Sequence, residues 1–107
     1  MYIHERKVLK RIIRNLKKRL PESISSVYVF GSKVRGDYDE ESDFDILIII
    51  KNKSPEIEKK IIGIIVDEEQ KSGLSFAPVI KDIRAFDSEK RFNTPFYRNI
   101  ITEGVQL

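Results

Sequence analysis

Cysteine is absent from this 107-residue sequence, so it has neither a disulfide framework nor a thiolate metal site. Histidine occurs once, at position 4, which argues against a histidine-based catalytic mechanism. No apolar run approaches the roughly 18 residues of a membrane span, and charge interrupts the N-terminal hydrophobic positions, unlike in a secretory signal. We therefore expect one domain over residues 1–107, in the reducing cytoplasm and not at a membrane.

Charge is plentiful, but its net value is small. Charged residues make up 35% of the chain and hydrophobic residues 40%, with a net charge of +3. Basic residues crowd the N-terminal segment without interleaved aromatic residues to stack bases: Arg6, Lys7, Lys10, Arg11, Arg14, Lys17, Lys18 and Arg19. We interpret this segment as a solvated helix face, with RNA or an acidic partner as the alternative. The sequence as a whole does not favour direct nucleic-acid binding.

Hydrophobic periodicity predicts three long elements. Residues 2–20 show one apolar helical stripe that ends before Pro21: Leu9, Ile12, Ile13, Leu16 and Leu20. Ser54-Pro55 predicts the start of a second helix, with Ile57, Ile61, Ile64 and Ile65 on one face and Gly73 as its stop. Thr94-Pro95 begins a third helix that runs to Gly104, with Phe96, Ile100 and Ile101 facing inward.

Three segments between these helices are predicted as strands. They cover Ser26 to Phe30, Phe44 to Ile50 and Leu74 to Ile80, followed by a turn at Lys81-Asp82 and a short segment to Phe86. The second is apolar on both faces, as interior strands are, and Pro78 indicates an edge or a bulge in the third. The order predicts an α+β fold with a small mixed β-sheet and helices packed on it.

The most informative segment joins the first two strands. Gly31-Ser32 follows the first strand, and Ser42-Asp43-Phe44-Asp45 opens the second. Side chains alternate along a strand, so Asp43 and Asp45 point the same way with Cα atoms about 6.6 Å apart. Two such carboxylates suit Mg²⁺, which completes its shell with water and substrate phosphates. Backbone N–H groups and the Ser32 hydroxyl can hold those phosphates.

The run G-S-x-x-R-G-x(5)-S-D-x-D before an apolar strand resembles the minimal nucleotidyltransferase (MNT) domain of the DNA polymerase β superfamily. The resemblance implies transfer of a nucleoside monophosphate from a nucleoside triphosphate to a hydroxyl or phosphate acceptor. It implies Asp43 and Asp45 as catalytic Mg²⁺ ligands. Arg35 would pair with phosphates or with the loop acids Asp37 and Asp39. Ser42 would join Gly31 and Ser32 in binding the nucleotide, or cap the strand entrance.

The family includes antitoxins that act on HEPN-domain toxins, and this implies a partner. The resemblance therefore suggests transfer of AMP from ATP to a hydroxyl on a small helical HEPN-type protein, as in a toxin–antitoxin pair. The edge strand with Pro78 and the C-terminal helix also offer a surface for a second copy of the chain.

One part of the family pattern is missing. Active members place a third carboxylate on the strand beside Asp-x-Asp, where it binds metal and accepts a proton. The third predicted strand contains no acid; Asp82 follows it and can reach the site only if the strand is short or bulged. The helix before it offers Asp67, Glu68 and Glu69. A weakly active or inactive module that regulates a partner by contact is therefore the alternative function.

Overall fold

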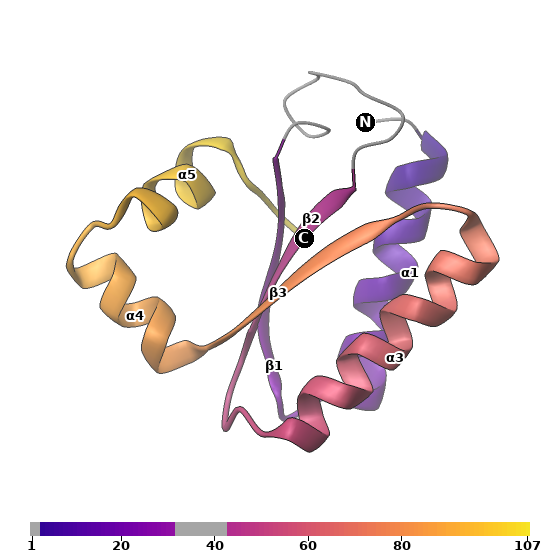
Figure 1. The fold of residues 1–107 in the computed structure, drawn as a ribbon, viewed down its shortest axis with the longest axis horizontal. Helices are drawn as coiled ribbons and strands as arrows, with labels where there is room; N and C mark the ends of the chain where they lie inside the picture. Colours follow the sequence, from indigo (N-terminus) through magenta and orange to yellow (C-terminus); the bar gives the residue numbers. More distant parts are fainter. Residues whose placement is uncertain (1–2, 32–42) are drawn as a thin grey trace.

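The computed structural model describes residues 3–31 and 43–107. Figure 1 shows these residues folded around one twisted sheet, with helices on both of its sides. The elements, in chain order, are α1 (Ile3–Arg19), β1 (Ile24–Phe30), β2 (Phe44–Ile50), α3 (Pro55–Ser72), β3 (Phe76–Asp82), α4 (Ile83–Arg91), α5 (Pro95–Glu103) and β4 (Val105–Gln106). Among these helices, none is long and apolar enough to cross a bilayer.

The sheet is mixed and has the strand order β3-β2-β1-β4. β1 pairs antiparallel with β2 and β4, whereas β2 pairs parallel with β3. A parallel pair needs a long crossover, which α3 supplies. α1 and α3 lie side by side on one face of the sheet, and α4 and α5 lie on the other (Figure 1). The α+β fold with a small mixed sheet is therefore confirmed.

β2 is the centre of both cores, as its apolar sequence predicts. Its alternate residues Phe44, Ile46, Ile48 and Ile50 join the core beneath α1 and α3. Leu47 and Ile49 point the other way, into a smaller core with Phe86 and Ile100. All these β2 side chains are buried. Burial of an Ile or Leu side chain contributes about 1.5–3 kcal/mol, so β2 anchors the sheet.

The two long helices form as their patterns predict. The apolar stripe of α1 is buried against the sheet. In α3, the Ser54 hydroxyl accepts a hydrogen bond from Ile57 N at 3.2 Å, and Pro55 occupies the first turn. Gly73 ends α3 with φ 75°, a left-handed conformation that glycine adopts without strain.

The third strand differs from the prediction in its position. It spans Phe76–Asp82, two residues later than expected, with Pro78 on the edge of the sheet. The carboxylate of Glu69 accepts a hydrogen bond from Phe76 N at 2.9 Å. N–H groups alternate in direction along a strand, so Pro78, which lacks one, faces the same outer edge as Phe76. The pairing with β2 continues without a bulge.

The C-terminal third contains two elements that were not predicted, α4 and β4, and two wrong assignments. The expected turn at Lys81-Asp82 is the end of β3, and Asp82 caps helix α4. The short strand β4 pairs with Tyr28 and Val29 of β1. Ile100 and Ile101 were both expected to face inward; Ile100 is buried, but Ile101 is 51% exposed, because neighbouring residues of a helix point in different directions.

Candidate functional site

The candidate metal-binding aspartates lie where β2 begins. Asp43 is exposed and immediately precedes the strand, and Asp45 is its second residue and half-buried. Phe44 between them points toward α1 and α3, where its ring lies 5.8 Å from that of Phe76. Alternation therefore places Asp45 on the α4/α5 side of the sheet, where it lines a pocket. Asp43 lies outside β2, so a shared direction of the two carboxylates stays a prediction.

Gly31, the first residue after β1, packs directly against Asp45. Its φ is 93°, a conformation that residues with a side chain rarely adopt. A Cβ atom at position 31 would overlap Asp45 Oδ2 and lie 3.2 Å from Asp45 Cγ. The strand register explains the contact, because Asp45 pairs with Phe30, the residue before Gly31. Glycine is therefore required for both conformation and space.

Asp45 also lines a pocket of about 390 Å³ between the sheet and α5. Residues from β1, β2 and α5 surround this pocket: Phe30, Gly31, Asp45, Phe96, Asn99, Ile100 and Glu103. Its floor is apolar, because the Phe30 and Phe96 rings meet edge to face at 6.2 Å and Ile100 is buried. Binding sites for small molecules typically combine an apolar floor with a few polar groups.

The residues of α5 in this pocket were not predicted as site residues. Phe96, Asn99, Ile100 and Glu103 follow the i, i+3, i+4, i+7 spacing of one helix face. That spacing was available in the sequence. Its relation to Asp45 was not, because it depends on how α5 folds back beside β1.

Three predicted nucleotide-binding residues lie outside the residues that the structure describes. These are Ser32, Arg35 and Ser42, together with the loop acids Asp37 and Asp39. Among the described site residues, the structure brings Gly31 and Asp45 into contact, with Asp43 two residues from Asp45.

The suggestion that Asp82 supplies a third carboxylate is wrong. Asp45 pairs with Ala77 in β3, whereas Asp82 pairs with Ile50, five residues further along β2. At about 3.3 Å per residue, Asp82 lies roughly 16 Å along the sheet from the position beside Asp45. The Asp82 carboxylate instead accepts hydrogen bonds from Arg84 N at 2.8 Å and Lys53 N at 3.2 Å. These bonds, that from Arg84 first, lower the pKa of Asp82 below its ordinary value of 3.8.

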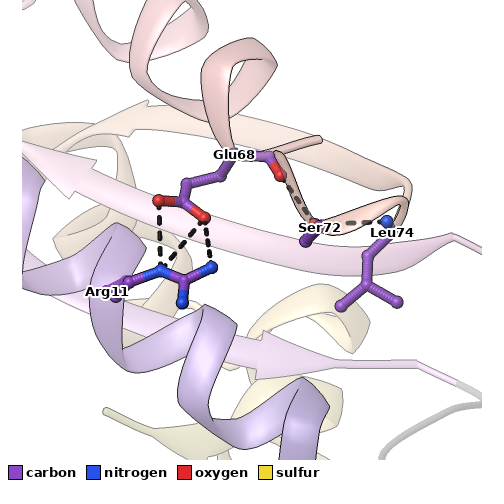
Figure 2. Close-up of polar contacts among 4 residues, drawn as sticks. All are labelled: Arg11, Glu68, Ser72 and Leu74. Atoms are coloured by element: carbon purple, nitrogen blue, oxygen red, sulfur yellow. Dashed lines mark hydrogen bonds and ion pairs between the residues drawn. The ribbon is translucent and has the colours of Figure 1, made fainter. Parts of the chain in front are cut away.

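Two of the acids on α3 are also engaged away from Asp45. Glu68 has only 3% of its surface exposed and forms a bidentate ion pair with Arg11 of α1 (Figure 2). Arg11 Nη2 and Glu68 Oε2 are 3.0 Å apart. Glu69 accepts the hydrogen bond that Phe76 N donates at the outer edge of β3. Across residues 3–31 and 43–107, no three His, Asp or Glu side chains cluster closely enough to hold a metal. A complete three-carboxylate site is therefore not found in this part of the chain.

Asp45 and Gly31, which come from the Asp-x-Asp and Gly-Ser motifs, therefore lie together at this pocket. The nucleotidyltransferase domain family matches residues 9–107, and the chain belongs to that family. This confirms the family that the Gly-Ser and Asp-x-Asp motifs indicated.

Two relatives from Methanocaldococcus jannaschii are named as candidate protein adenylyltransferases. One is 33% identical over 101 residues, covering 94% of this chain and 95% of the relative. The other is 31% identical over 103 residues, covering 95% of this chain and 96% of the relative. The likeness therefore extends over nearly the whole length of all three proteins.

Solved structures show the same fold. A candidate nucleotidyltransferase from Sulfolobus solfataricus is 25% identical, with a TM-score of 0.51 over 94% of this chain and 76% of that one. A toxin–antitoxin structure with AMP-PNP is 18% identical, with a TM-score of 0.55; the match covers 90% of this chain and 69% of that one. A mutant of the MntA–HpeT toxin–antitoxin complex is 20% identical, with a TM-score of 0.56; the match covers 92% of this chain and 69% of that one.

Proposed function

We propose that this protein transfers AMP from ATP to a hydroxyl group of a protein partner, with Mg²⁺ held by Asp43 and Asp45. The observation that carries the proposal is the contact between Gly31 and the Asp45 carboxylate at the pocket under α5. It joins the turn that would hold phosphates to a carboxylate that would hold the metal. The two relatives named for protein adenylylation support AMP as the transferred group and a protein as the acceptor.

The residues at the start of β2 fit a hard divalent cation. Asp43 and Asp45 offer only oxygen ligands, and Asp45 is half-buried beside a pocket large enough for part of a nucleotide. No side chain at position 31 separates this carboxylate from the turn. When bound, Mg²⁺ neutralises triphosphate charge and orients the α-phosphate for in-line attack.

The chain's own residues position the reactants. Gly31 lets the triphosphate approach the backbone, and the apolar floor formed by Phe30, Phe96 and Ile100 receives the nucleoside. In the transfer, the acceptor oxygen forms a bond to the α-phosphorus, and the bond to the β-phosphate breaks to release pyrophosphate. The hydroxyl proton passes to water or to a group of the partner, because Ala77 occupies the position beside Asp45.

The proposed partner is a small helical protein of the HEPN type. The resemblance to MNT antitoxins suggests it, and similar folds occur in solved toxin–antitoxin structures. Ser32, Arg35 and Ser42 keep their proposed roles as further contacts to the nucleotide.

A contact-only module is a second candidate function, and one observation favours it. Ala77 stands beside Asp45 on β3, the strand on which the resemblance implies a third acid in active members. Loss of a general base typically costs about 10²–10⁴ in rate. Such a module could retain nucleotide affinity while controlling its partner by binding alone.

The test is transfer of label from ATP to a HEPN-type protein encoded beside this chain. With Mg²⁺, α-phosphate-labelled ATP should label the partner and γ-phosphate-labelled ATP should not, because AMP is the transferred group. Asp43→Asn/Asp45→Asn should abolish labelling. Asp67→Asn/Asp87→Asn, which changes two exposed aspartates on α3 and α4, should not. A partner left unlabelled but still bound would support the contact-only module.

A further inference from the structure

The charge of the protein is concentrated on one helix. α1 carries eight Lys or Arg residues and one Glu, a net charge of +7. The rest of the 107-residue chain has twelve basic and sixteen acidic residues, a net charge of −4. The net charge of +3 is therefore the sum of a strongly basic helix and an acidic remainder of the chain. Such asymmetry creates a local field that attracts polyanions.

Part of this charge surrounds a hollow on the exposed side of α1. Lys7, Lys10, Arg11 and Arg14 line it, and its volume is about 270 Å³. They follow the i, i+3, i+4, i+7 spacing, so their Cβ atoms are about 5–6 Å apart along one face. All four residues are exposed. The opposite face of α1 is buried in the core, which fixes the orientation of the basic face.

Arg11 is held in place at the centre of this group. Its Nε and Nη2 atoms donate to the Glu68 carboxylate at 3.0–3.3 Å, as Figure 2 shows. The Glu68 side chain is only 4% exposed, whereas that of Arg11 is 46% exposed. A guanidinium has five N–H donors, so the remaining ones are available to a ligand on the solvent side. The pair therefore orients Arg11 without covering it.

The other three cations are not neutralised within the described part of the chain. No ion pair or hydrogen bond involves the side chains of Lys7, Lys10 or Arg14 among residues 3–31 and 43–107. The group therefore retains about three positive charges. From residue 7 to residue 14 the helix rises about 10 Å, a length that matches about three successive phosphates of one nucleic-acid strand.

We propose that this basic face of α1 binds the phosphodiester backbone of a nucleic acid, without sequence preference. The composition of the hollow favours this ligand over an acidic protein surface. Protein interfaces are depleted in lysine, which makes up half of the lining, and their hot spots combine Arg with Trp and Tyr, which the hollow lacks. The absence of aromatic residues in its lining also removes base stacking, which leaves the backbone as the contact.

The face lies apart from the candidate transfer site. α1 packs on one side of the sheet, and α5 lies on the other (Figure 1). The pocket beside Asp45 is lined by residues of α5. Nucleic-acid binding is therefore expected to persist in the Asp43→Asn/Asp45→Asn variant. This separation makes the inference independent of the proposed transfer activity.

The test is fluorescence anisotropy of labelled single-stranded RNA and duplex DNA, titrated with the full chain at several salt concentrations. With about three phosphates contacted, log K should fall against log salt with a slope of about −2 to −3. Lys7→Gln/Lys10→Gln/Arg14→Gln should weaken binding at least about tenfold and flatten the slope by about 2. Glutamine keeps helix propensity, and Arg11 and Glu68 remain, so the fold is preserved.

The matched control is Lys59→Gln/Lys60→Gln/Lys90→Gln, which removes the same charge from exposed positions on α3 and α4. It should change affinity less than about threefold, since these lysines lie outside the hollow. If both variants lose the same affinity for nucleic acid, binding depends on net charge alone and the proposal is overturned. No binding by the unmodified protein at about 50 mM salt would overturn it. Polyglutamate binding as tightly as RNA would assign the face to an acidic protein instead.

Discussion

The backbone of Gly31 lies against the carboxylate of Asp45, so closely that no other residue fits at position 31 without movement. This contact joins the end of β1 to the start of β2 in a way that strand pairing alone would not require. It explains why glycine and aspartate occur together in the motif. Asp45 lines the pocket, and Gly31, which has no side chain, lets the backbone after β1 pack against its carboxylate.

Substitution of Gly31 should therefore impair the site. Gly31→Ala forces a side chain into a left-handed conformation, which costs about 1 kcal/mol or more of stability, and displaces the Asp45 carboxylate. We expect Mg²⁺-dependent ATP affinity, measured by calorimetry, to fall about tenfold or more, because a displaced supporting group typically costs 10–100-fold.

Gly63→Ala is the matched control for this substitution. Gly63 lies within α3, and nothing lies within 4 Å of the position of its added Cβ. Alanine at this helical position should raise stability by about 0.5–1 kcal/mol and leave ATP affinity unchanged. Unchanged ATP affinity in Gly31→Ala would show that the contact has no role in the site.

Ala77→Asp should add the missing third carboxylate. Position 77 pairs with Asp45 in the parallel register, and it is half-buried near the start of β3. An aspartate there would lie beside Asp45 and could accept the proton of the attacking hydroxyl. We expect the rate of label transfer to rise about tenfold or more, within the range that a general base supplies. Ala77→Asn is the control of equal size, and an aspartate variant no faster than it would contradict the prediction.

Asp82 should contribute to stability in a pH-dependent manner. Hydrogen bonds from Arg84 N and Lys53 N lower its pKa in the folded state, so the charged form is favoured by folding. A depressed pKa stabilises the fold above the unfolded value and loses this effect as pH falls through the folded value. Asp82→Asn should lower the melting temperature by a few degrees near pH 7, because it removes the negative charge that strengthens both hydrogen bonds and faces the N-terminus of α4.

The melting-temperature difference between Asp82→Asn and the unmodified protein should start to shrink as pH falls below the ordinary pKa of 3.8, and should be lost as pH falls through the lower pKa of the folded state. Thermal melts at pH 7 and pH 3 measure it. Asp87→Asn, at an exposed position in α4, is the control. A difference that stays the same at both pH values would show that the charge of Asp82 does not contribute.

Local signals in the sequence were sufficient to predict the limits of the elements around the site. Ser54, Pro55 and Gly73 set the limits of α3, and the unbroken apolar run set those of β2, because caps and buried strands depend on neighbouring residues. The Gly-Ser and Asp-x-Asp motifs also identified the family that the whole-chain comparison confirms.

Features that depend on distant contacts could not be predicted. The start of β3 depends on pairing with Phe44 and on Glu69 from the preceding helix. Asp82 carries no local sign that distinguishes a helix cap from a metal ligand. β4 has two residues, too few for a strand pattern, and exists because β1 offers a free edge at Tyr28 and Val29. Asn99 and Glu103 could be assigned to the pocket only once the position of α5 against the sheet was known.

The most direct test of the account is calorimetric titration of ATP into the purified protein with and without Mg²⁺. We expect binding that requires Mg²⁺, that Asp43→Asn/Asp45→Asn abolishes, and that Asp67→Asn/Asp87→Asn preserves. Such a result would establish a working metal–nucleotide site at the start of β2. ATP binding of equal strength in the Asp43→Asn/Asp45→Asn variant, or no binding under any condition, would contradict the central claim for this chain.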